Sequence, residues 1–281
     1  MRVLVTGAGG LLASAIAAEF ASCGTVERAT HRDLDVTDER AVHVCIDRVR
    51  PDVVINCAAF NDVDAAEDRA NVALALNAFA VLGLARAAAA HEATLVHYGT
   101  DFVFDGETSR PYREEDRPRP RNVYAASKLL GEWFAAEAPR HYVLRVESLF
   151  GPPAASGGRR GSLGTIVDRL RQGEEVPVFV DRVVSPSFTI DVASATRRLL
   201  ASSAPFGTYH CVNDGAATWR EVAEEAARQL GVAPRIRPLT LETAALKAAR
   251  PRYCALSPAR LASLGIVMPP WQDALAAFLK G

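Results

Sequence analysis

The first half of the chain alternates short apolar runs with longer alanine-rich stretches of helical spacing, and this alternation restricts the fold more than any other feature. The apolar runs are continuous, as expected for parallel strands that are buried on both faces of a sheet. The stretches between them predict helices that connect neighbouring strands. We expect strands at 3–6, 25–30, 52–56, 94–98 and 142–146, and helices at 11–23, 38–49, 70–91 and 123–138. The sequence therefore predicts a doubly wound α/β sheet with its ligand crevice at the carboxyl ends of the strands.

Composition excludes several classes of function. The 281 residues carry a net charge of -1, which argues against electrostatic binding to nucleic acid or to an anionic membrane. The five cysteines are widely spaced and form no CxxC pair, so neither a zinc site nor a disulfide framework is expected. The sequence has no signal-peptide pattern and no run of 18 or more apolar residues. We expect a cytoplasmic protein, either a monomer or a homodimer, with no metal site.

A glycine-rich turn, Gly7-Ala-Gly-Gly10-Leu-Leu-Ala13, follows the first predicted strand and opens the first predicted helix. Small residues at such a turn let the backbone approach a pyrophosphate, which the N–H groups and dipole of the following helix then hold. Its place between a strand and a helix favours nucleotide binding over a plain connection. Gly7, Gly10, Leu11 and Leu12 are therefore candidate cofactor-binding residues.

The end of the second predicted strand usually decides between the two nicotinamide cofactors. A carboxylate there would bind the ribose 2′-hydroxyl of NADH. Here Arg32 stands in that region, with Asp35 and Val36 just beyond it and able to flank the adenine. Arg32 can pair with the 2′-phosphate of NADPH, although a solvated surface charge explains it about as well. We expect NADPH to be preferred, with NADH possible.

Tyr124 and Lys128 have YxxxK spacing on a predicted helix, so they share one helix face. A neighbouring ammonium group lowers the pKa of a phenol and makes it a better proton donor. Thr100 follows the fourth predicted strand, where its hydroxyl can hydrogen-bond a substrate carbonyl. A chance surface pair remains the alternative explanation of the YxxxK spacing. We predict that Thr100, Tyr124 and Lys128 catalyse carbonyl reduction.

The pattern changes after Gly151. Residues 152–164 are rich in Pro, Gly, Ser and Arg and predict a loop. Helical and short-strand pieces follow, interrupted by prolines. We expect 1–150 to form an NAD(P)-binding domain and 151–281 to form mainly a smaller substrate-binding lobe, interleaved with the sheet.

These residues resemble the extended short-chain dehydrogenase/reductases, and within them the dTDP-4-dehydrorhamnose reductase family. The resemblance extends along nearly the whole chain in order. It rests on 34–38, 51–59, 63–64 with Glu67, 100–106, 111–112 with Glu114, 122–132, 185–186 with Asp191, 207–210, 218–219, 250–253 and 270–271. It implies a Rossmann fold and reduction of the 4-keto group of a nucleotide-linked, dTDP-type 6-deoxyhexose, as in dTDP-L-rhamnose or a related deoxysugar pathway.

The resemblance also implies further site residues. Cys57, Ala58 and Ala59, together with Tyr124 and Lys128, should lie along the cofactor. The sugar should face five residues, namely Asn61, Val63, Asp101, Phe102 and Ser148. The departures from the family pattern gather at the sugar. Phe60-Asn61 replaces a common Tyr-Thr pair, Phe102 a tyrosine, and Ser148 the tryptophan of an Arg-Thr-Ser-Trp run. An aromatic wall of the sugar pocket is therefore expected to be missing.

Two other functions remain open from the sequence. The chain could be a non-catalytic NADP-binding regulatory subunit, resembling that of methionine adenosyltransferase. It could also be another extended short-chain sugar-nucleotide epimerase or a dehydratase. The intact set of Thr100, Tyr124 and Lys128 favours a reductase over the first alternative. Dehydratases typically carry an Asp-Glu pair after the threonine, whereas Phe102 follows Asp101 here.

Overall fold

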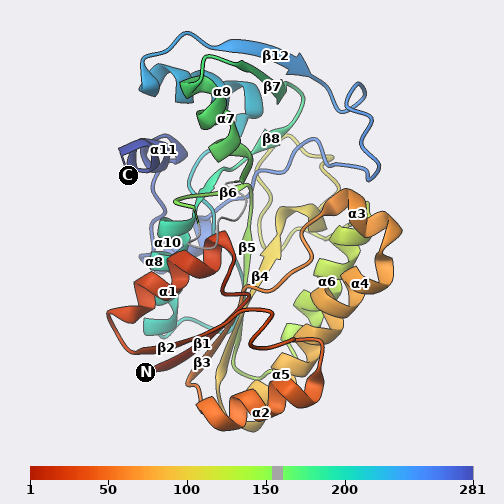
Figure 1. Cartoon of the computed structure of the whole chain (residues 1–281), viewed down its shortest axis with the longest axis vertical. Coiled ribbons are helices and arrows are strands. Elements are labelled where there is room, and N and C mark those ends of the chain that lie inside the picture. The colour runs from red at the N-terminus through yellow and green to blue at the C-terminus, as the bar shows by residue number, and fades with distance from the viewer. Residues whose placement is uncertain (154–160, 281) are drawn as a thin grey trace.

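The computed structural model describes residues 1–153 and 161–280, and a six-stranded parallel sheet forms its centre. Figure 1 shows the sheet in the half of the molecule that holds the N-terminus. The strands stand in the order β10-β5-β4-β3-β1-β2. Their bounds are Arg2–Thr6 (β1), Thr25–Ala29 (β2), Val53–Asn56 (β3), Thr94–Thr100 (β4), His141–Val146 (β5) and Gly207–His210 (β10). The parallel pairing brings the carboxyl ends of all six to one edge, as the sequence predicted.

Helices cover both faces of the sheet, which confirms the doubly wound fold. On one face α1 (Leu11–Ala21) and α8 (Thr189–Ala201) lie side by side (Figure 1). On the other face lie α2 (Glu39–Val49), α5 (Ala80–Ala90) and α6 (Val123–Ala135). The apolar side chains of each layer form a separate core cluster against the strands. Fully buried strands explain why the sequence shows continuous apolar runs.

The long helix predicted at 70–91 is present, but it has an unusual segment near its middle. It consists of α4 (Ala70–Leu74), a π-helical turn (Ala75–Phe79) and α5. Its 21 residues are apolar and long enough to cross a membrane by length and composition, yet 56% of its most apolar window is buried inside the structure. Because this helix packs on β4 and α6, a place in the core accounts for its apolar character.

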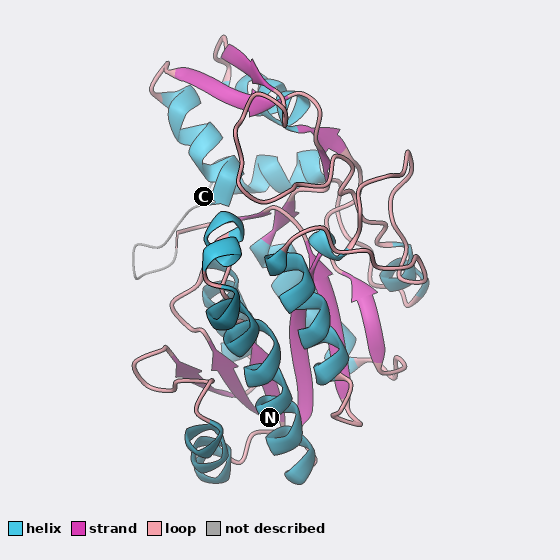
Figure 2. Ribbon diagram, turned by 90° about the vertical axis from the view of Figure 1, so that its right-hand side faces the viewer, coloured by secondary structure: helices cyan, strands magenta, loops and turns pink. Residues whose placement is uncertain are grey.

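The second half of the chain forms the other part of the molecule, shown above the sheet in Figure 1 and from the side in Figure 2. Two-stranded sheets and helices pack there around a core cluster of their own. The helices of this core are α7 (Gly161–Arg171), α9 (Trp219–Leu230) and α11 (Trp271–Lys280). The short helix α10 (Ala259–Ser263) instead packs on β10, with Leu261 in the core cluster of the central sheet. The short sheets pair β7 (Glu175–Phe179) with β12 (Arg235–Leu239), β8 (Val183–Val184) with β11 (Ala217–Thr218), and β6 (Leu149–Phe150) with β9 (Ser187–Phe188).

The two halves of the chain are interleaved, because β10 and α8 come from beyond residue 150 yet belong to the central sheet and its helical layer. The loop predicted at 152–164 is wrong at its end, where α7 already begins at Gly161. Residues 154–160 of that predicted loop lie outside the described residues. The sequence analysis also missed α3 (Val63–Asp68), a helix too short for periodicity to indicate.

Candidate active site

The glycine-rich turn is shaped for close contact between β1 and β3. Gly7 has a φ of 64°, which favours glycine, and a Cβ at this position would lie 2.6 Å from the backbone nitrogen of Ala58. Gly10 caps the N-terminus of α1 in an extended conformation. The first N–H groups of α1 have no partner within the helix, and the glycines before them carry no side chain that would cover them. This is the arrangement that holds a pyrophosphate.

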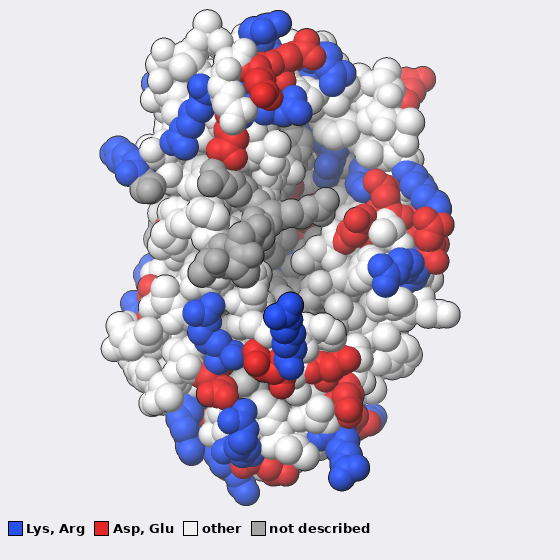
Figure 3. Space-filling model, viewed as in Figure 1, with Lys and Arg blue, Asp and Glu red and all other residues white. Residues whose placement is uncertain are grey.

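A cavity of about 520 Å³ extends from this turn along the carboxyl edge of the sheet. It lies between the two parts of the molecule, where Figure 3 shows the surface hollowed. Most of the residues expected at the site line this cavity, and they are Gly10, Leu11, Leu12, Cys57, Ala58, Ala59, Asn61, Val63, Thr100, Asp101, Phe102, Tyr124, Lys128 and Ser148. A cavity of this size suits a small-molecule ligand.

Tyr124 is nearly buried on the first turn of α6. Asn122 caps this helix by accepting a hydrogen bond from Ala125 N at 2.7 Å, and it fixes where the helix begins. The side chain of Tyr124 is in edge contact with the Phe102 ring, with centroids 5.7 Å apart. Burial raises the pKa of Tyr124, although a hydrogen bond with the Thr100 hydroxyl opposes this shift. Tyr124 therefore keeps its proton at neutral pH, as a proton donor must.

Lys128 lies one helical turn beyond Tyr124 and is 3% exposed. Its Nζ donates a hydrogen bond to the carbonyl oxygen of Tyr98 at 2.6 Å. Burial lowers the pKa of Lys128 to about 8, while the charges of Glu132 and Cys57 act in the opposite direction. The expectation that Lys128 lowers the pKa of Tyr124 is wrong for this structure, because the ammonium group is bound to β4 and burial dominates at the phenol.

Thr100 ends β4, with its side chain 6% exposed at the cavity wall. Its hydroxyl donates a hydrogen bond to Asp101 Oδ1 at 3.0 Å and accepts one from the Phe102 backbone N–H at 3.3 Å. The expected trio of Thr100, Tyr124 and Lys128 thus meets at one wall of the cavity.

The sequence analysis missed a buried polar cluster at the same wall. Glu147 and Arg182 line the cavity beside Asp101, and oxygen and sulfur atoms of Asp101, Glu147 and Cys254 lie within 4.8 Å of one another. The Arg182 guanidinium donates to Cys254 Sγ at 3.3 Å. That cation neutralises part of the acidic charge, which argues for a carboxyl–guanidinium cluster rather than a metal site. Only the three-dimensional structure brings these four distant positions together.

Aromatic side chains also reach the cavity. The sequence analysis expected a missing aromatic wall because Ser148 replaces a tryptophan. Phe102 and Trp219, the first residue of α9, both line the cavity. The C-terminal lobe therefore supplies an indole from a different position than the tryptophan that Ser148 replaces.

Four of the residues expected at the cofactor do not line the cavity. They are Gly7, which begins the glycine-rich turn, and Arg32, Asp35 and Val36, which follow β2. Arg32 is exposed. The Asp35 carboxylate accepts hydrogen bonds from the backbone and hydroxyl of Thr37. The strand β2 itself ends beside the glycine-rich turn, where Ala8 N donates to Ala29 O.

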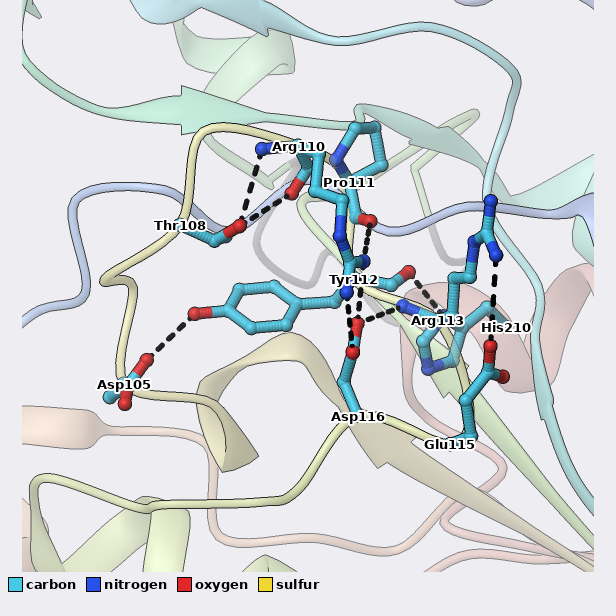
Figure 4. Close-up of polar contacts among 9 residues, drawn as sticks. All are labelled: Asp105, Thr108, Arg110, Pro111, Tyr112, Arg113, Glu115, Asp116 and His210. Atoms are coloured by element: carbon cyan, nitrogen blue, oxygen red, sulfur yellow. Dashed lines mark hydrogen bonds and ion pairs between the residues drawn. The ribbon is translucent and has the colours of Figure 1, made fainter.

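The loop between β4 and α6 supports the catalytic residues from outside the cavity, and Figure 4 shows its contacts. Arg110 forms an ion pair with Asp116, and the Tyr112 hydroxyl donates to Asp105 Oδ1 at 2.8 Å. The Tyr112 ring stacks on Phe104 at a centroid distance of 4.1 Å. These contacts fold the loop onto the sheet, so both Thr100 and Tyr124 stand on a fixed support.

Comparison with known proteins supports the resemblance. The family model described as the RmlD substrate binding domain matches residues 1–281. The chain belongs to the dTDP-4-dehydrorhamnose reductase family. It is thus an NAD(P)-dependent oxidoreductase with a Rossmann fold.

Individual relatives agree over their full lengths. A dTDP-4-dehydrorhamnose reductase of Streptomyces griseus is 37% identical over 284 residues, covering 98% of this chain and 91% of that protein. A probable dTDP-4,6-dihydroxy-2-methyloxan-3-one 4-ketoreductase of Streptomyces antibioticus is 35% identical, with 98% and 93% covered. The structure of the Bacillus anthracis dTDP-4-dehydrorhamnose reductase in complex with NADP superposes with a TM-score of 0.93 at 30% identity, covering 99% and 98%.

Proposed function

We propose that this protein uses NADPH to reduce the 4-keto group of a nucleotide-linked 4-keto-6-deoxyhexose. The nucleotide is dTDP, and the product belongs to a dTDP-L-rhamnose or related deoxysugar pathway. The observation that carries the proposal is the meeting of Thr100, Tyr124 and Lys128 at the wall of a cavity that begins at the glycine-rich turn. The names of the Streptomyces and Bacillus relatives support this substrate class.

The cofactor fits the residues of the site. The bare backbone at Gly7 and Gly10 leaves room for a pyrophosphate on the N-terminus of α1. Leu11, Leu12, Cys57, Ala58 and Ala59 would line the path toward the nicotinamide, and Lys128 would hold its ribose. When bound, the cofactor supplies a hydride for C4 of the sugar. Arg32, with Asp35 and Val36 nearby, would face the adenosine end, and the NADP complex of the Bacillus anthracis relative supports the preference for NADPH.

The protein's own residues handle the proton and the charge on the ketone oxygen. Tyr124 donates its phenolic proton to that oxygen as negative charge develops there. Thr100 donates a hydrogen bond to the same oxygen, and the low exposure of both side chains strengthens these interactions. The ammonium group of Lys128 lies at the same wall, bound to Tyr98 O, and its proposed role is to hold the nicotinamide ribose.

The two parts of the chain have different roles in this proposal. We propose that residues 1–150 bind the cofactor and that 151–281 mainly complete the sugar pocket. Asn61, Val63, Asp101, Phe102 and Ser148 would face the sugar, together with Arg182 and Trp219 from the second half. Because the two Streptomyces relatives carry names for different sugars, these residues would decide which ketone is accepted.

The proposal is tested by following NADPH oxidation with purified protein against a panel of dTDP-4-keto-6-deoxyhexoses. Turnover of at least one member is expected, with a product whose C4 carries a hydroxyl group. Tight NADPH binding without turnover of any member would contradict the proposal and favour a non-catalytic NADP-binding subunit. C4 or C5 inversion without net NADPH consumption would instead indicate an epimerase.

A further inference from the structure

The buried carboxyl groups of Asp101 and Glu147 have no role in the chemistry described above. Both side chains are 3% exposed and both line the cavity. One oxygen of each, Asp101 Oδ2 and Glu147 Oε1, is buried without a hydrogen-bond partner among the described residues. An unpartnered buried carboxylate oxygen is costly, and it indicates that the group either binds a ligand or carries a proton.

The surrounding charges favour retention of a proton. Arg182 is the cation that faces both carboxyl groups, and Cys254 lies between them and that guanidinium. Two carboxylates against one guanidinium would leave an uncompensated buried charge, whereas one retained proton makes the cluster neutral. Burial and the Asp101 charge raise the pKa of Glu147 well above its ordinary value, so Glu147 retains this first proton. Burial also raises the pKa of Asp101 to about 6, opposed by Arg182, Thr100 and Cys254, so Asp101 takes up a second proton as the pH falls toward 6.

The protonation state of Asp101 decides what the catalytic threonine can do. A hydroxyl group has one hydrogen to donate and two lone pairs that accept. When Asp101 is ionised its Oδ1 can only accept, so the Thr100 hydroxyl donates its hydrogen to Asp101 across the 3.0 Å contact, and one lone pair accepts the Phe102 N–H. With its hydrogen held by Asp101, Thr100 has none left for a substrate ketone.

We propose that Asp101 is a positioning residue that acts in its protonated form, donating from Oδ1 to Thr100 Oγ1 so that the single hydrogen of Thr100 is directed to the substrate's ketone oxygen. In that state Thr100 has both lone pairs occupied, by Phe102 N–H and Asp101 O–H, and one hydrogen free for the ketone. Burial favours this protonated form of Asp101, and the charge of Arg182 opposes it. This inference rests on the proposed reduction.

A second effect acts in the same direction. The negative charge of ionised Asp101 raises the pKa of Tyr124 and makes the phenol a weaker proton donor. Neutral Asp101 removes that penalty.

The test compares three proteins, namely the wild type, Asp101→Asn and Glu147→Gln. Asparagine keeps the shape of the side chain and can donate to Thr100 at every pH, whereas Glu147→Gln removes only the titration of its neighbour. The measurement is the single-turnover rate of NADPH oxidation against pH, with a substrate that the wild type reduces. Above the pKa of Asp101 the wild-type rate should fall by up to about tenfold per pH unit.

The same titration should persist in Glu147→Gln and be absent from Asp101→Asn, whatever the absolute rates of the two variants. A titration that remains in Asp101→Asn, or that disappears only in Glu147→Gln, overturns the proposal. A wild-type rate that does not fall with rising pH in this range overturns it as well.

Infrared difference spectroscopy of the ligand-free protein decides the protonation of Asp101 without any turnover. Between about pH 5 and pH 8 the wild type and Glu147→Gln should lose a protonated-carboxyl signal that Asp101→Asn lacks. Absence of that signal from the wild type overturns the inference. Failure of the wild type to reduce any keto sugar would contradict the proposed function separately, because the infrared result does not depend on substrate.

Discussion

At the scale of single residues, burial has opposite effects on the functional forms of Tyr124 and Lys128. Burial favours the neutral phenol of Tyr124, which is the form that can donate a proton. Burial disfavours the charged ammonium group of Lys128 and lowers its pKa to about 8. The proposed mechanism uses a charged Lys128, and burying that charge lowers the free energy of unfolding. This cost can be measured.

Replacement of Tyr124 by phenylalanine should abolish most of the turnover and leave NADPH affinity intact. Loss of a general acid lowers rates by roughly 10²- to 10⁴-fold. Steady-state rates and a fluorescence titration with NADPH measure the two properties separately. Tyr142→Phe is the matched control, since it removes a hydroxyl that bonds to Ala204 O away from the cavity. An unchanged rate in Tyr124→Phe would show that another group donates the proton.

Replacement of Lys128 by methionine should stabilise the ligand-free protein while lowering its activity. The folded-state pKa of about 8 lies below the ordinary lysine value of 10.5, so the unfolded chain binds more protons between these values and stability rises with pH there. Below pH 8 the full penalty of burying the charge applies. The variant should then gain about 1–3 kcal/mol in the free energy of unfolding, because the lost bond to Tyr98 O offsets part of the penalty.

Urea denaturation at several pH values measures this gain, which should shrink as the pH rises from about 8 to 10.5. The matched control is Lys247→Met, because Lys247 is exposed and pairs with Asp68 at the surface. A gain of the same size and pH dependence in the control would show that burial of Lys128 is not its cause.

The residues that lie close together in the sequence, or follow strand ends, could be predicted. Tyr124 and Lys128 share a helix face by spacing alone, and Thr100 was expected at the end of a strand. Glu147 and Arg182 could not be predicted, since they are 35 positions apart and meet only because β6 and β9 bring the second lobe back to the sheet. Trp219 was noticed as part of the resemblance, but no local signal placed it at the cavity.

At the scale of elements, the close approach of α6 to the π-helical turn fixes the catalytic face of α6. A Cβ at Gly131 would collide with the backbone oxygen of Asn77. The Asn77 side chain in turn donates to Phe60 O and Ser127 Oγ, at 3.1 and 3.0 Å. The π-helical turn thus ties α6 to the strand-end loop that carries the cofactor-facing alanines.

Gly131→Ala should therefore force the two helices apart and cost about 1–3 kcal/mol in the free energy of unfolding, with a loss of activity. Gly83→Ala is the matched control, because a Cβ there meets only Glu39 Cγ at 3.9 Å. An alanine in the middle of α5 should stabilise the protein by up to about 1 kcal/mol. Thermal unfolding and turnover of the two variants measure both effects. Equal behaviour of the two would show that the close contact is unimportant.

The elements of the first half were predictable because their burial follows a simple rule, in which continuous apolar runs give strands and alanine-rich spacing gives helices. The π-helical turn was not predictable, since its composition is that of the α-helix around it. The C-terminal lobe was expected only in outline. Its sheets have two strands each, and strands of two residues such as β8 and β9 are too short to produce a pattern.

At the scale of the whole molecule, the cavity exists only because two parts of different construction face each other. The sheet presents the carboxyl ends of its strands, and the second lobe adds Arg182 and Trp219 from above. A ligand of this cavity should therefore bind the folded form alone. NADPH at about 100 times its dissociation constant should then add about 2.7 kcal/mol to the free energy of unfolding.

The preference between NADPH and NADH can be measured from the stabilisation that each cofactor gives. Arg32 is exposed beside the glycine-rich turn, so a 2′-phosphate is the group that would gain from its charge. Arg32→Ala should reduce the thermal stabilisation by NADPH and leave the stabilisation by NADH almost unchanged. Arg48→Ala is the control, because this guanidinium is exposed as well but pairs with Glu27 at 3.0 Å. Equal losses with both cofactors would mean that Arg32 does not recognise the phosphate. A preference for NADPH would then need a different cation near the end of β2, such as Arg28, which donates to Ala8 O at 3.3 Å.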